Sequence, residues 1–384
     1  MRLSNCHNLS DLRELAFKRL PAPLFHYLEG GADDEWTLRR NTSAFDDYEL
    51  LPTQLRDVAQ VDATTALLGL KLDWPVFLAP TGMSRLFHHE AEPAVARAAA
   101  KFGTLYSLST VATTKLEDIG ALTTGPKMFQ LYIFKDRGLT TELIQRCKAA
   151  GYAALCLTVD TAVQGNRERD KRTGMMLPPK WTAASWWSFM THPAWSLHAL
   201  LNPKFELANV SHRVAAARTT TSLIGFINSQ FDRTLTWKDA EWLVQQWDGP
   251  VVIKGVQSSG DAQHAVDIGA RGIMISNHGG RQLEGTPAPV DCVRPIRDRI
   301  GNALDVIVDG GVRRGNHVVK ALALGASACS IGRGYLYGLA AGGQAGVERA
   351  LDLLRSEVLV TMALLGVRSL AEITPEHIQH RPGR

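Results

Sequence analysis

The chain has 384 residues, of which 45% are hydrophobic and 21% are charged, as in an ordinary soluble globular protein. This length would allow two domains, although an α/β barrel of similar size often forms a single one. The net charge of +4 is too small and too dispersed to indicate a nucleic-acid-binding protein.

A helical segment opens the chain. Between Ser10 and Leu28 the apolar residues recur at helical spacing, and a Gly30-Gly31 pair follows. We therefore expect residues 1–73 to form a lid segment ahead of the main domain. Tyr27 stands near the end of this helix, where its position alone favours an ordinary apolar packing contact.

One unit then repeats along the chain: a helix, a glycine and an apolar strand. Glycine in the left-handed conformation commonly ends a helix, and alternating helices and strands indicate a parallel sheet. The helices are expected at 92–102, 139–150, 261–268 and 316–324, and the strands after them at 104–107, 153–159, 272–276 and 327–331. Further strands are expected at 74–80, 128–131, 251–254 and 306–309.

Eight parallel strands with helices between them predict a (β/α)8 TIM barrel over residues 74–340, within a single domain of residues 1–384. A long insert after the fourth strand, at about 171–215, and C-terminal helices at 341–384 complete the prediction. A doubly wound open sheet is the alternative, but no GxGxxG sequence follows the first strand, as a dinucleotide-binding fold would need.

Polar residues gather at the C-terminal ends of the predicted strands, where barrels place their chemistry. These ends carry Thr81, Ser109, Gln130, Tyr132, Thr158, Asp160, Lys254, Ser276, His278, Asp309 and Arg333. Assorted turn residues would rarely be so uniformly polar, so the ring of strand ends is predicted to be the functional site.

Within this ring, His278 and Arg281 share the turn that follows the sixth strand. Histidine has an unperturbed pKa near working pH, which suits proton removal. Arginine offers a planar, two-pronged donor that matches a carboxylate. The pair indicates proton abstraction beside a bound carboxylate, with a solvated turn as the alternative on these two residues alone.

The last two strand ends are typical of an anion site. The runs 309–315 and 330–334 combine glycines with arginines, and barrels commonly bind phosphate in these loops. Lys254, at the end of the fifth strand, is suited either to a Schiff base with a carbonyl substrate or to holding negative charge on a cofactor. The residues alone leave both roles open.

Five motifs occur in order at the predicted strand ends and on one helix. They are Phe-Gln-Leu-Tyr at 129–132, Leu-Thr-Val-Asp-Thr at 157–161, Ser-Asn-His-Gly-Gly-Arg-Gln at 276–282, Asp-Gly-Gly-Val-Arg-Arg-Gly at 309–315 and Lys-Ala-Leu-Ala-Leu-Gly-Ala at 320–326. Together they resemble the FMN-dependent L-2-hydroxy acid oxidase/dehydrogenase family, from about Leu9 to Ile378 with one variable insert.

The resemblance implies a role in catalysis or substrate binding for six residues. His278 would be the base, and Asp160 would orient it and stabilise its charged form. The substrate would be bound by Tyr27, Tyr132, Arg167 and Arg281. The α-hydrogen would leave either as a hydride or as a proton, and both routes use the same base. From position alone, Arg167 lies in a charged run that is typical of a solvated face.

The resemblance also implies an FMN site. Lys254 would stabilise the reduced flavin, whose ring would be lined by Ala79, Pro80, Thr81, Ser109, Gln130, Thr158 and Ser276. The ribityl phosphate would be held by Asp309, Gly311, Arg313, Gly332 and Arg333. From position alone, Gln130 and Thr158 would serve equally well to satisfy backbone groups at the strand ends.

Two positions depart from the pattern of many oxidases in this family. Gly82 stands where many of them carry alanine beside the flavin, and Val111 stands where the plant glycolate oxidases have tryptophan. Both changes predict more space over the substrate and so favour a longer or aromatic side chain. Gly82 also indicates that this protein is one of the family members whose reduced flavin reacts slowly with oxygen.

The insert at 175–205 is rich in tryptophan and leucine, and Lys180 and Lys204 carry its only formal charges. Such a composition suits the headgroup layer of a bilayer, whereas a lid on the barrel or a subunit contact is the alternative. The sequence His-Pro-Ala-Trp-Ser-Leu at 192–197 resembles inserts of the membrane-associated bacterial mandelate and lactate dehydrogenases. That resemblance favours membrane contact.

No segment predicts a signal peptide or a membrane-spanning helix. The five cysteines show no spacing typical of a metal site, and Cys156 and Cys329 fall in predicted strands, which indicates inert buried thiols. The expected location is the cytoplasm, with peripheral attachment to the inner face of the plasma membrane. The resemblance adds a tetrameric assembly.

The sequence therefore predicts an enzyme that oxidises a mandelate-like or lactate-like L-2-hydroxy acid to the 2-oxo acid and passes electrons to a membrane quinone. One alternative is a soluble oxidase that uses oxygen and releases hydrogen peroxide. A second is a flavin-free barrel that binds a phosphorylated metabolite, and a third is a docking scaffold without turnover.

Overall fold

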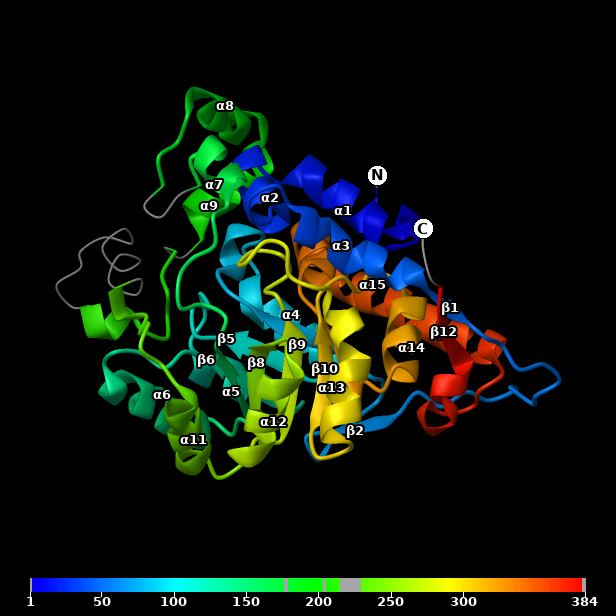
Figure 1. The fold of residues 1–384 in the computed structure, drawn as a ribbon. Coiled ribbons are helices and arrows are strands. Elements are labelled where there is room, and N and C mark those ends of the chain that lie inside the picture. The colour runs from blue at the N-terminus through cyan, green and yellow to red at the C-terminus, as the bar shows by residue number, and fades with distance from the viewer. Residues whose placement is uncertain (1, 176–178, 203–204, 215–228, 382–384) are drawn as a thin grey trace.

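The structure is a computed structural model that describes residues 2–175, 179–202, 205–214 and 229–381. Eight parallel strands form a closed barrel, in the order β10-β11-β4-β5-β6-β7-β8-β9 (Figure 1). The strands are β4 (Val76–Thr81), β5 (Tyr106–Ser109), β6 (Lys127–Leu131), β7 (Ala154–Thr158), β8 (Val251–Val256), β9 (Gly272–Ser276), β10 (Asp305–Asp309) and β11 (Ala328–Ile331). The predicted (β/α)8 barrel is confirmed.

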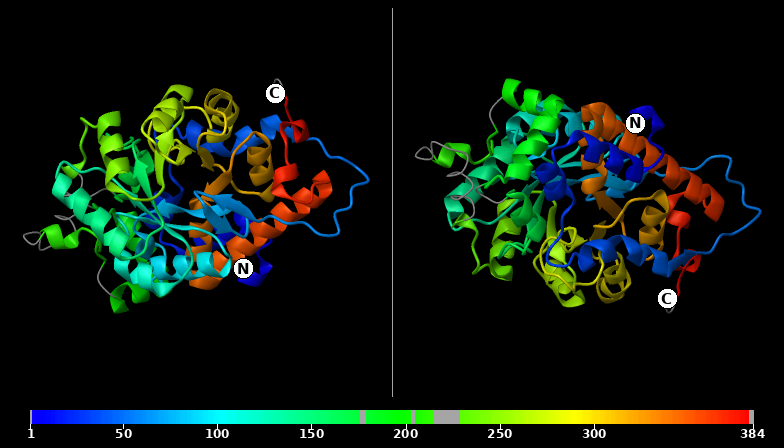
Figure 2. Two further views of the ribbon diagram at one scale, coloured as in Figure 1. Left: turned by 90° about the horizontal axis from the view of Figure 1, so that it is seen from below. Right: turned by 90° about the horizontal axis from the view of Figure 1, so that it is seen from above.

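Helices surround the barrel and cover its outer face, so nearly every strand residue is buried. They are α4 (Ala91–Lys101), α5 (Leu116–Leu122), α6 (Arg137–Ala149), α11 (Trp237–Gln246), α12 (Ser259–Asp267), α13 (Val293–Ile300), α14 (Gly315–Ala323) and α15 (Arg333–Leu365). α15 is kinked at Gly342 and Gly343, whose backbone angles are not helical. The views from below and above show this ring of helices (Figure 2).

Short elements complete the chain. The 3-10 helices are η1 (Leu3–Asn5), η2 (Ala44–Asp47), η3 (Ser84–Leu86), η4 (Ser211–Val214), η5 (Pro289–Cys292), η6 (Leu370–Glu372) and η7 (Pro375–His377). β1 (Tyr48–Leu50) pairs antiparallel with β12 (Ile378–His380), which joins the two ends of the chain.

A hairpin of β2 (Thr65–Leu67) and β3 (Leu70–Leu72) closes the N-terminal end of the barrel. Its two turn residues, Leu68 and Gly69, both have positive φ, as a tight hairpin turn requires. Its leucines pack with side chains from inside the barrel, including Phe77, Met274 and Ile307, in one buried cluster. This end of the barrel is therefore filled by apolar side chains.

The N-terminal helix that we expected over 10–28 is two helices, α1 (Leu9–Arg19) and α2 (Ala22–Glu29). Pro21 separates them, because a residue before proline is pushed out of the helical conformation, and Leu20 is extended. α2 is followed by α3 (Trp36–Ser43). Helices α1 to α3 lie across the C-terminal end of the barrel (Figure 2, right).

The insert follows β7 and holds α7 (Glu168–Thr173), α8 (Ala183–Thr191) and α9 (Pro193–Leu201). These helices lie beside α2 at the C-terminal end of the barrel (Figure 1). Lys204 lies outside the described residues. Among the helices that the structure describes, none has the length and apolar character needed to cross a bilayer. All five cysteines are buried, and Cys156 and Cys329 lie in strands β7 and β11, as the sequence predicts.

Candidate active site

A cavity of about 470 Å³ opens at the C-terminal end of the barrel. Of the residues predicted for the site, those lining it are Tyr27, Ala79, Pro80, Thr81, Ser109, Gln130, Tyr132, Thr158, Arg167, Lys254, His278, Arg281, Asp309, Gly311, Arg313, Gly332 and Arg333. The other two, Asp160 and Ser276, lie directly behind this lining, where they bond His278 and Lys254. One cavity therefore brings all the predicted positions together.

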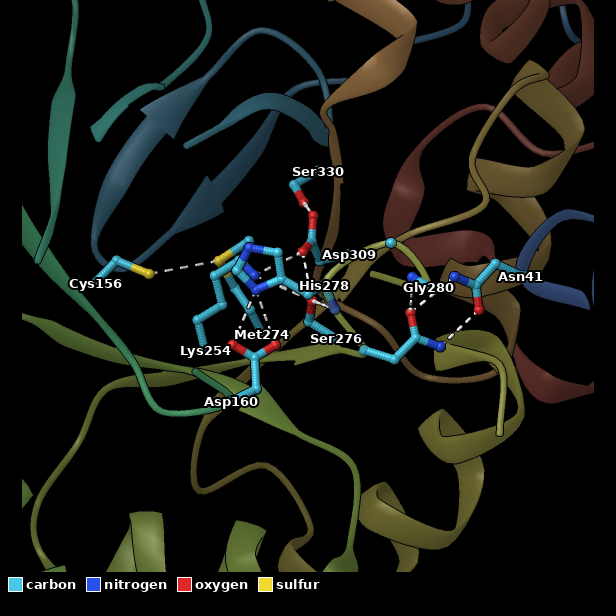
Figure 3. Close-up of polar contacts among 12 residues, drawn as sticks. Asn41, Cys156, Asp160, Lys254, Met274, Ser276, His278, Gly280, Asp309 and Ser330 are labelled. Carbon is cyan, nitrogen blue, oxygen red and sulfur yellow. Dashed lines mark hydrogen bonds and ion pairs between the residues drawn. The ribbon is translucent and has the colours of Figure 1, made fainter. Parts of the chain in front are cut away.

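His278 is paired with Asp160 across the ends of β9 and β7 (Figure 3). The imidazole Nδ1 lies 3.0 and 3.2 Å from the two carboxylate oxygens. Burial opposes ionisation of Asp160, but the charges of His278 and Lys254 and the hydrogen bond to His278 outweigh it and lower the pKa of Asp160. Because an ionised carboxylate only accepts hydrogen bonds, Nδ1 carries a proton, so in the neutral imidazole the lone pair is on Nε2.

The turn that carries His278 is unusual because three successive residues have a positive φ. The values are 58° for His278, 66° for Gly279 and 74° for Gly280. A Cβ on Gly280 would lie 2.6 Å from the backbone of Leu38, so glycine is required there. Such backbone conformations persist only where surrounding contacts impose them. Here the Asn277 side chain bonds Gly280 N and forms a paired amide contact with Asn41 of α3.

Lys254 is buried at the end of β8 within a network of polar side chains (Figure 3). Its Nζ lies 3.3 Å from Asp309 Oδ2 and 3.2 Å from Ser276 Oγ, and Ser276 donates to Asp309 at 2.7 Å. Desolvation lowers the pKa of Lys254, but Asp309 and Asp160 together outweigh it and raise the pKa. A lysine held protonated is a fixed charge rather than a nucleophile, which argues against the Schiff-base role.

Two guanidinium groups flank the ring of Tyr27, with Arg281 5.0 Å and Arg167 5.5 Å from its centroid. Arg281 Nη1 donates to the carbonyls of Tyr27 and Gly30, which leaves Nε and Nη2 for another acceptor. Burial lowers the pKa of Arg281 to about 9, and the charge of Arg167 adds to this effect. Two arginines with one neighbouring carboxylate, Asp170, leave a net positive charge in this part of the cavity, which favours binding of a further carboxylate.

Asp170 was not predicted for the site, yet it is buried beside these arginines. Its Oδ2 lies 3.4 Å from Arg167 Nε, and its Oδ1 has no hydrogen-bond partner. Burial raises the pKa of Asp170, against the opposing charges of Arg167 and Arg281. Within the charged run at 166–170, Arg167 and Asp170 therefore do not belong to a solvated face. The sequence of the run does not distinguish these two buried residues from its other members, because their burial depends on contacts with distant segments.

The cavity has the donors and the close approaches that a flavin mononucleotide requires. Gln130 Nε2 and Thr158 Oγ1 are buried with no hydrogen-bond partner, which is costly unless a ligand satisfies them. At the last two strand ends Gly311 has a φ of 77°, and a Cβ there would lie 1.8 Å from Asn41 O. The residues present fit FMN.

Arg333 has a role that the sequence analysis missed. Its Nε, Nη1 and Nη2 donate to the carbonyls of Leu28, Gly279 and Gly30, respectively. Three of the five guanidinium N–H groups thus fasten α2 and the His278 turn to the barrel. The remaining two are available to an anion, as is most of the guanidinium of Arg313, whose Nη1 bonds Val312 O.

Gly82 and Val111, the two positions that depart from many oxidases, touch each other in the cavity wall. A Cβ on Gly82 would lie 2.4 Å from Val111 Cγ2. The loops that carry Gly82 and Val111 are both bonded to Glu92, a buried carboxylate. The sequence predicted Glu92 only as the first residue of a helix. Glu92 accepts hydrogen bonds from Ser84 N at 3.1 Å and Thr113 N at 2.9 Å.

A barrel mouth with an imidazole base, a buried ammonium group and an arginine fork defines a flavin enzyme that acts on small carboxylic acids. Comparison with known proteins gives the family. The FMN-dependent dehydrogenase family matches residues 16–380. An L-lactate dehydrogenase of Xanthomonas campestris is 42% identical over 366 residues, which cover 95% of each chain.

Solved structures agree. The monotopic membrane protein (S)-mandelate dehydrogenase superposes with a TM-score of 0.94 at 34% identity, covering 98% of this chain and 100% of that one. A soluble mutant of the membrane-associated (S)-mandelate dehydrogenase from Pseudomonas putida gives a TM-score of 0.83 at 33% identity, with the same coverage. The chain belongs to the FMN-dependent dehydrogenase family and is an FMN-dependent 2-hydroxy acid dehydrogenase. The flavin-free alternative is therefore wrong.

The contact between Gly82 and Val111 predicts a strong energetic coupling. We expect Gly82→Ala to destabilise the holoenzyme by about 1–3 kcal/mol through overpacking. Adding Val111→Ala removes the obstructing methyl groups, so the double variant should be more stable than the sum of the two single changes predicts, by about 1 kcal/mol or more. Urea unfolding of the four proteins measures this coupling, and additive energies would contradict the contact.

Proposed function

We propose that this enzyme oxidises an L-2-hydroxy acid with a mandelate-like or lactate-like side chain to the 2-oxo acid and passes the electrons to a membrane quinone. The main support is one observation: His278, which is bonded to Asp160 behind it, lines the same cavity as Arg281, Arg167 and Tyr27. A base and a carboxylate site thus lie together, as oxidation beside a carboxylate requires.

His278 would act as the base. With Nδ1–H held by Asp160, Nε2 accepts the proton from the substrate, and the carboxylate stabilises the imidazolium that forms. The positive φ of His278 and the glycines after it fix the direction of the ring. Tyr132 lines the same cavity, and its raised pKa, caused by burial, keeps its hydroxyl protonated to bond the substrate.

The substrate carboxylate would bind to Arg281 and Arg167, which both lie close to the Tyr27 ring. Because Arg281 Nη1 is already bonded to backbone carbonyls, its Nε and Nη2 form the available fork. A bound carboxylate would supply the negative charge that this group of side chains lacks. Arg167 shares its charge with Asp170, so the two arginines are matched to one further carboxylate.

Bound FMN supplies the electron-accepting ring. Lys254, held protonated by Asp309, would place a fixed positive charge beside that ring. Gln130 Nε2 and Thr158 Oγ1 would gain the partners that they lack. The ribityl phosphate would bind at Gly311, Gly332, Arg313 and the two free N–H groups of Arg333, with Asp309 at the edge of the same corner.

An aromatic or extended substrate side chain suits the rest of the cavity. Its wall beside Gly82 and Val111 continues into apolar residues from three segments, namely Met83, Phe87, Leu207 and Phe231. Apolar walls stabilise an apolar side chain by about 25 cal/mol per Å² buried. This lining supports a mandelate-like substrate first and a lactate-like one second.

An exposed apolar surface on α8 and α9 supports membrane attachment. Trp186, Trp187, Met190, Leu197, Leu200 and Leu201 are exposed, with 66% of Trp187 and 83% of Leu200 accessible. Trp181, Phe189 and Trp195 instead pack together beneath them. Large exposed apolar patches mark interaction surfaces, and tryptophan suits the interfacial layer of a bilayer. The higher TM-score with the monotopic membrane protein is in keeping with this role.

We therefore propose a peripheral protein on the cytoplasmic face of the plasma membrane, with a membrane quinone as electron acceptor. Attachment through α8 and α9 would bring the barrel mouth close to the bilayer, because both helices lie at that end (Figure 1). The tetrameric assembly stays a prediction from the family resemblance.

The base assignment predicts the effect of His278→Gln. The variant should keep its FMN, because the phosphate corner and Lys254 are unchanged, but lose turnover by about 100-fold or more. His264→Gln, an exposed histidine on α12, is the control and should match the parent enzyme. Steady-state rates and anaerobic flavin reduction measure both. Unchanged turnover in His278→Gln would refute the assignment.

The electron acceptor is tested by reducing the holoenzyme anaerobically with (S)-mandelate, L-lactate and their mirror images, and then adding either a quinone analogue or air. We expect reduction by the L-type acids alone, and reoxidation that is faster with the quinone. Faster reoxidation by air, with hydrogen peroxide as product, would establish the oxidase alternative.

Membrane attachment is tested by replacing Trp186 and Trp187 with serine and Leu200 and Leu201 with glutamine. Each buried side chain of this size contributes about 1.5–3 kcal/mol, so the fourfold variant should no longer sediment with phospholipid vesicles while its turnover is retained. Val360→Ser with Leu364→Gln, two exposed residues of α15, is the matched control. Equal sedimentation of all three proteins would contradict the proposal.

A further inference from the structure

A group of histidines lies outside the flavin site, where the insert contacts the barrel. His88, His89 and Glu90 follow η3 and precede α4, and His198 belongs to α9. The ligand atoms of His88, His89 and Glu90 all lie within 4.8 Å of one another. Among the residues that the structure describes, this is the group with the composition and closeness of a metal site.

We propose that His88, His89 and Glu90 bind a divalent transition-metal ion such as Zn²⁺. Imidazole nitrogens and a carboxylate oxygen are ligands that zinc accepts, and three protein ligands leave a further position for water. Nothing in the oxidation chemistry uses these residues, so the proposed site is independent of the active site.

Packing holds the three ligands close together. The rings of His88 and His89 are stacked with centroids 4.3 Å apart, and the ring of His198 is stacked on that of His89 with centroids 4.1 Å apart. Glu90 Oε2 accepts a hydrogen bond of 2.6 Å from Gln344 N at the kink of α15. The φ of Gly343 is 59°, and a Cβ there would lie 2.2 Å from Glu90 Oε2 and 2.7 Å from His88 Cε1. A glycine at the kink is therefore needed for this approach.

Coordination requires a neutral imidazole with a lone pair on the nitrogen that meets the ion. His88 Nδ1 accepts a long contact of 3.3 Å from Glu90 N, so coordination through Nε2 would move the His88 proton to Nδ1 and open that contact.

Two cations face the group. Arg85 donates to His89 O, and Arg19 donates to Ala341 O near His88. Both guanidinium groups are thus engaged with backbone carbonyls, and the Glu90 carboxylate offsets part of their charge. A bound ion would place a positive charge next to the Glu90 carboxylate and the imidazoles of His88, His89 and His198.

The site would fasten the insert to the barrel. His198 reaches the group from α9 through its stacking on His89, and Trp195 of the same helix donates from Nε1 to Leu86 O at 3.0 Å. Metal binding would fix the orientation of His89 and thereby the contact between α9 and the loop after β4. His198 acts as a positioning residue in this arrangement.

The test uses untagged holoenzyme, freed of metal by a chelator and dialysed against Zn²⁺. We expect about one zinc ion per chain and a rise in melting temperature with zinc concentration. His89→Ala and, separately, Glu90→Gln should abolish both effects while FMN content and turnover stay normal. His198→Ala should keep the ion but bind it about tenfold more weakly. His264→Ala is the control and should behave as the parent enzyme.

Three results would overturn the proposal: no saturable zinc binding by the parent enzyme, equal binding by His89→Ala, or equal binding by Glu90→Gln. The two ligand variants change different side chains, so a folding defect in one leaves the other to decide. Flavin absorbance and far-ultraviolet circular dichroism report that each variant is folded.

Discussion

A buried ammonium group, that of Lys254, constrains the whole site. An unpaired charge in this position would cost several kcal/mol, so its partners must be present and in register. They are supplied by neighbouring strands: Ser276 ends β9 and Asp309 ends β10, and Asp309 lies in register with both Ser276 and Ser330 of β11. Strands β8 to β11 therefore contribute residues to one network. The partners of the Lys254 charge come into place only when these strands pair in register, so neutralising the buried charge requires a correctly formed barrel.

The N-terminal segment depends on the same core. The lid role predicted for residues 1–73 stays a prediction; Tyr27 and Leu28 of α2 line the cavity, and α2 and α3 are bonded to the turn that carries His278 and to the start of α15. Arg333 and Arg281 donate to carbonyls at the end of α2, and Asn41 of α3 pairs with Asn277. Arg281 both binds the lid and faces the cavity. In the proposed function, substrate binding and the packing of the N-terminal segment therefore share one guanidinium group.

The sequence predicted the barrel well because helices ended by glycine and short apolar strands are local signals. It predicted the site because a barrel gathers every C-terminal strand end, so motifs far apart in the chain had to meet. Asp170 and Glu92 were missed, since their burial comes from partners more distant than any periodic pattern reports. Likewise, the three backbone bonds of Arg333 depend on where α2 lies, and no pattern in the sequence around Arg333 reports that position.

The apolar plug at the N-terminal end has a kinetic consequence. Leu67 and Leu72 fill that end of the barrel, so in the described part of the chain we expect the hydroxy acid and the oxidant to enter the cavity from its other, C-terminal end. We therefore expect the 2-oxo acid to leave the cavity before the oxidant binds. Double-reciprocal plots drawn at several oxidant concentrations should thus be parallel lines, the signature of a ping-pong order.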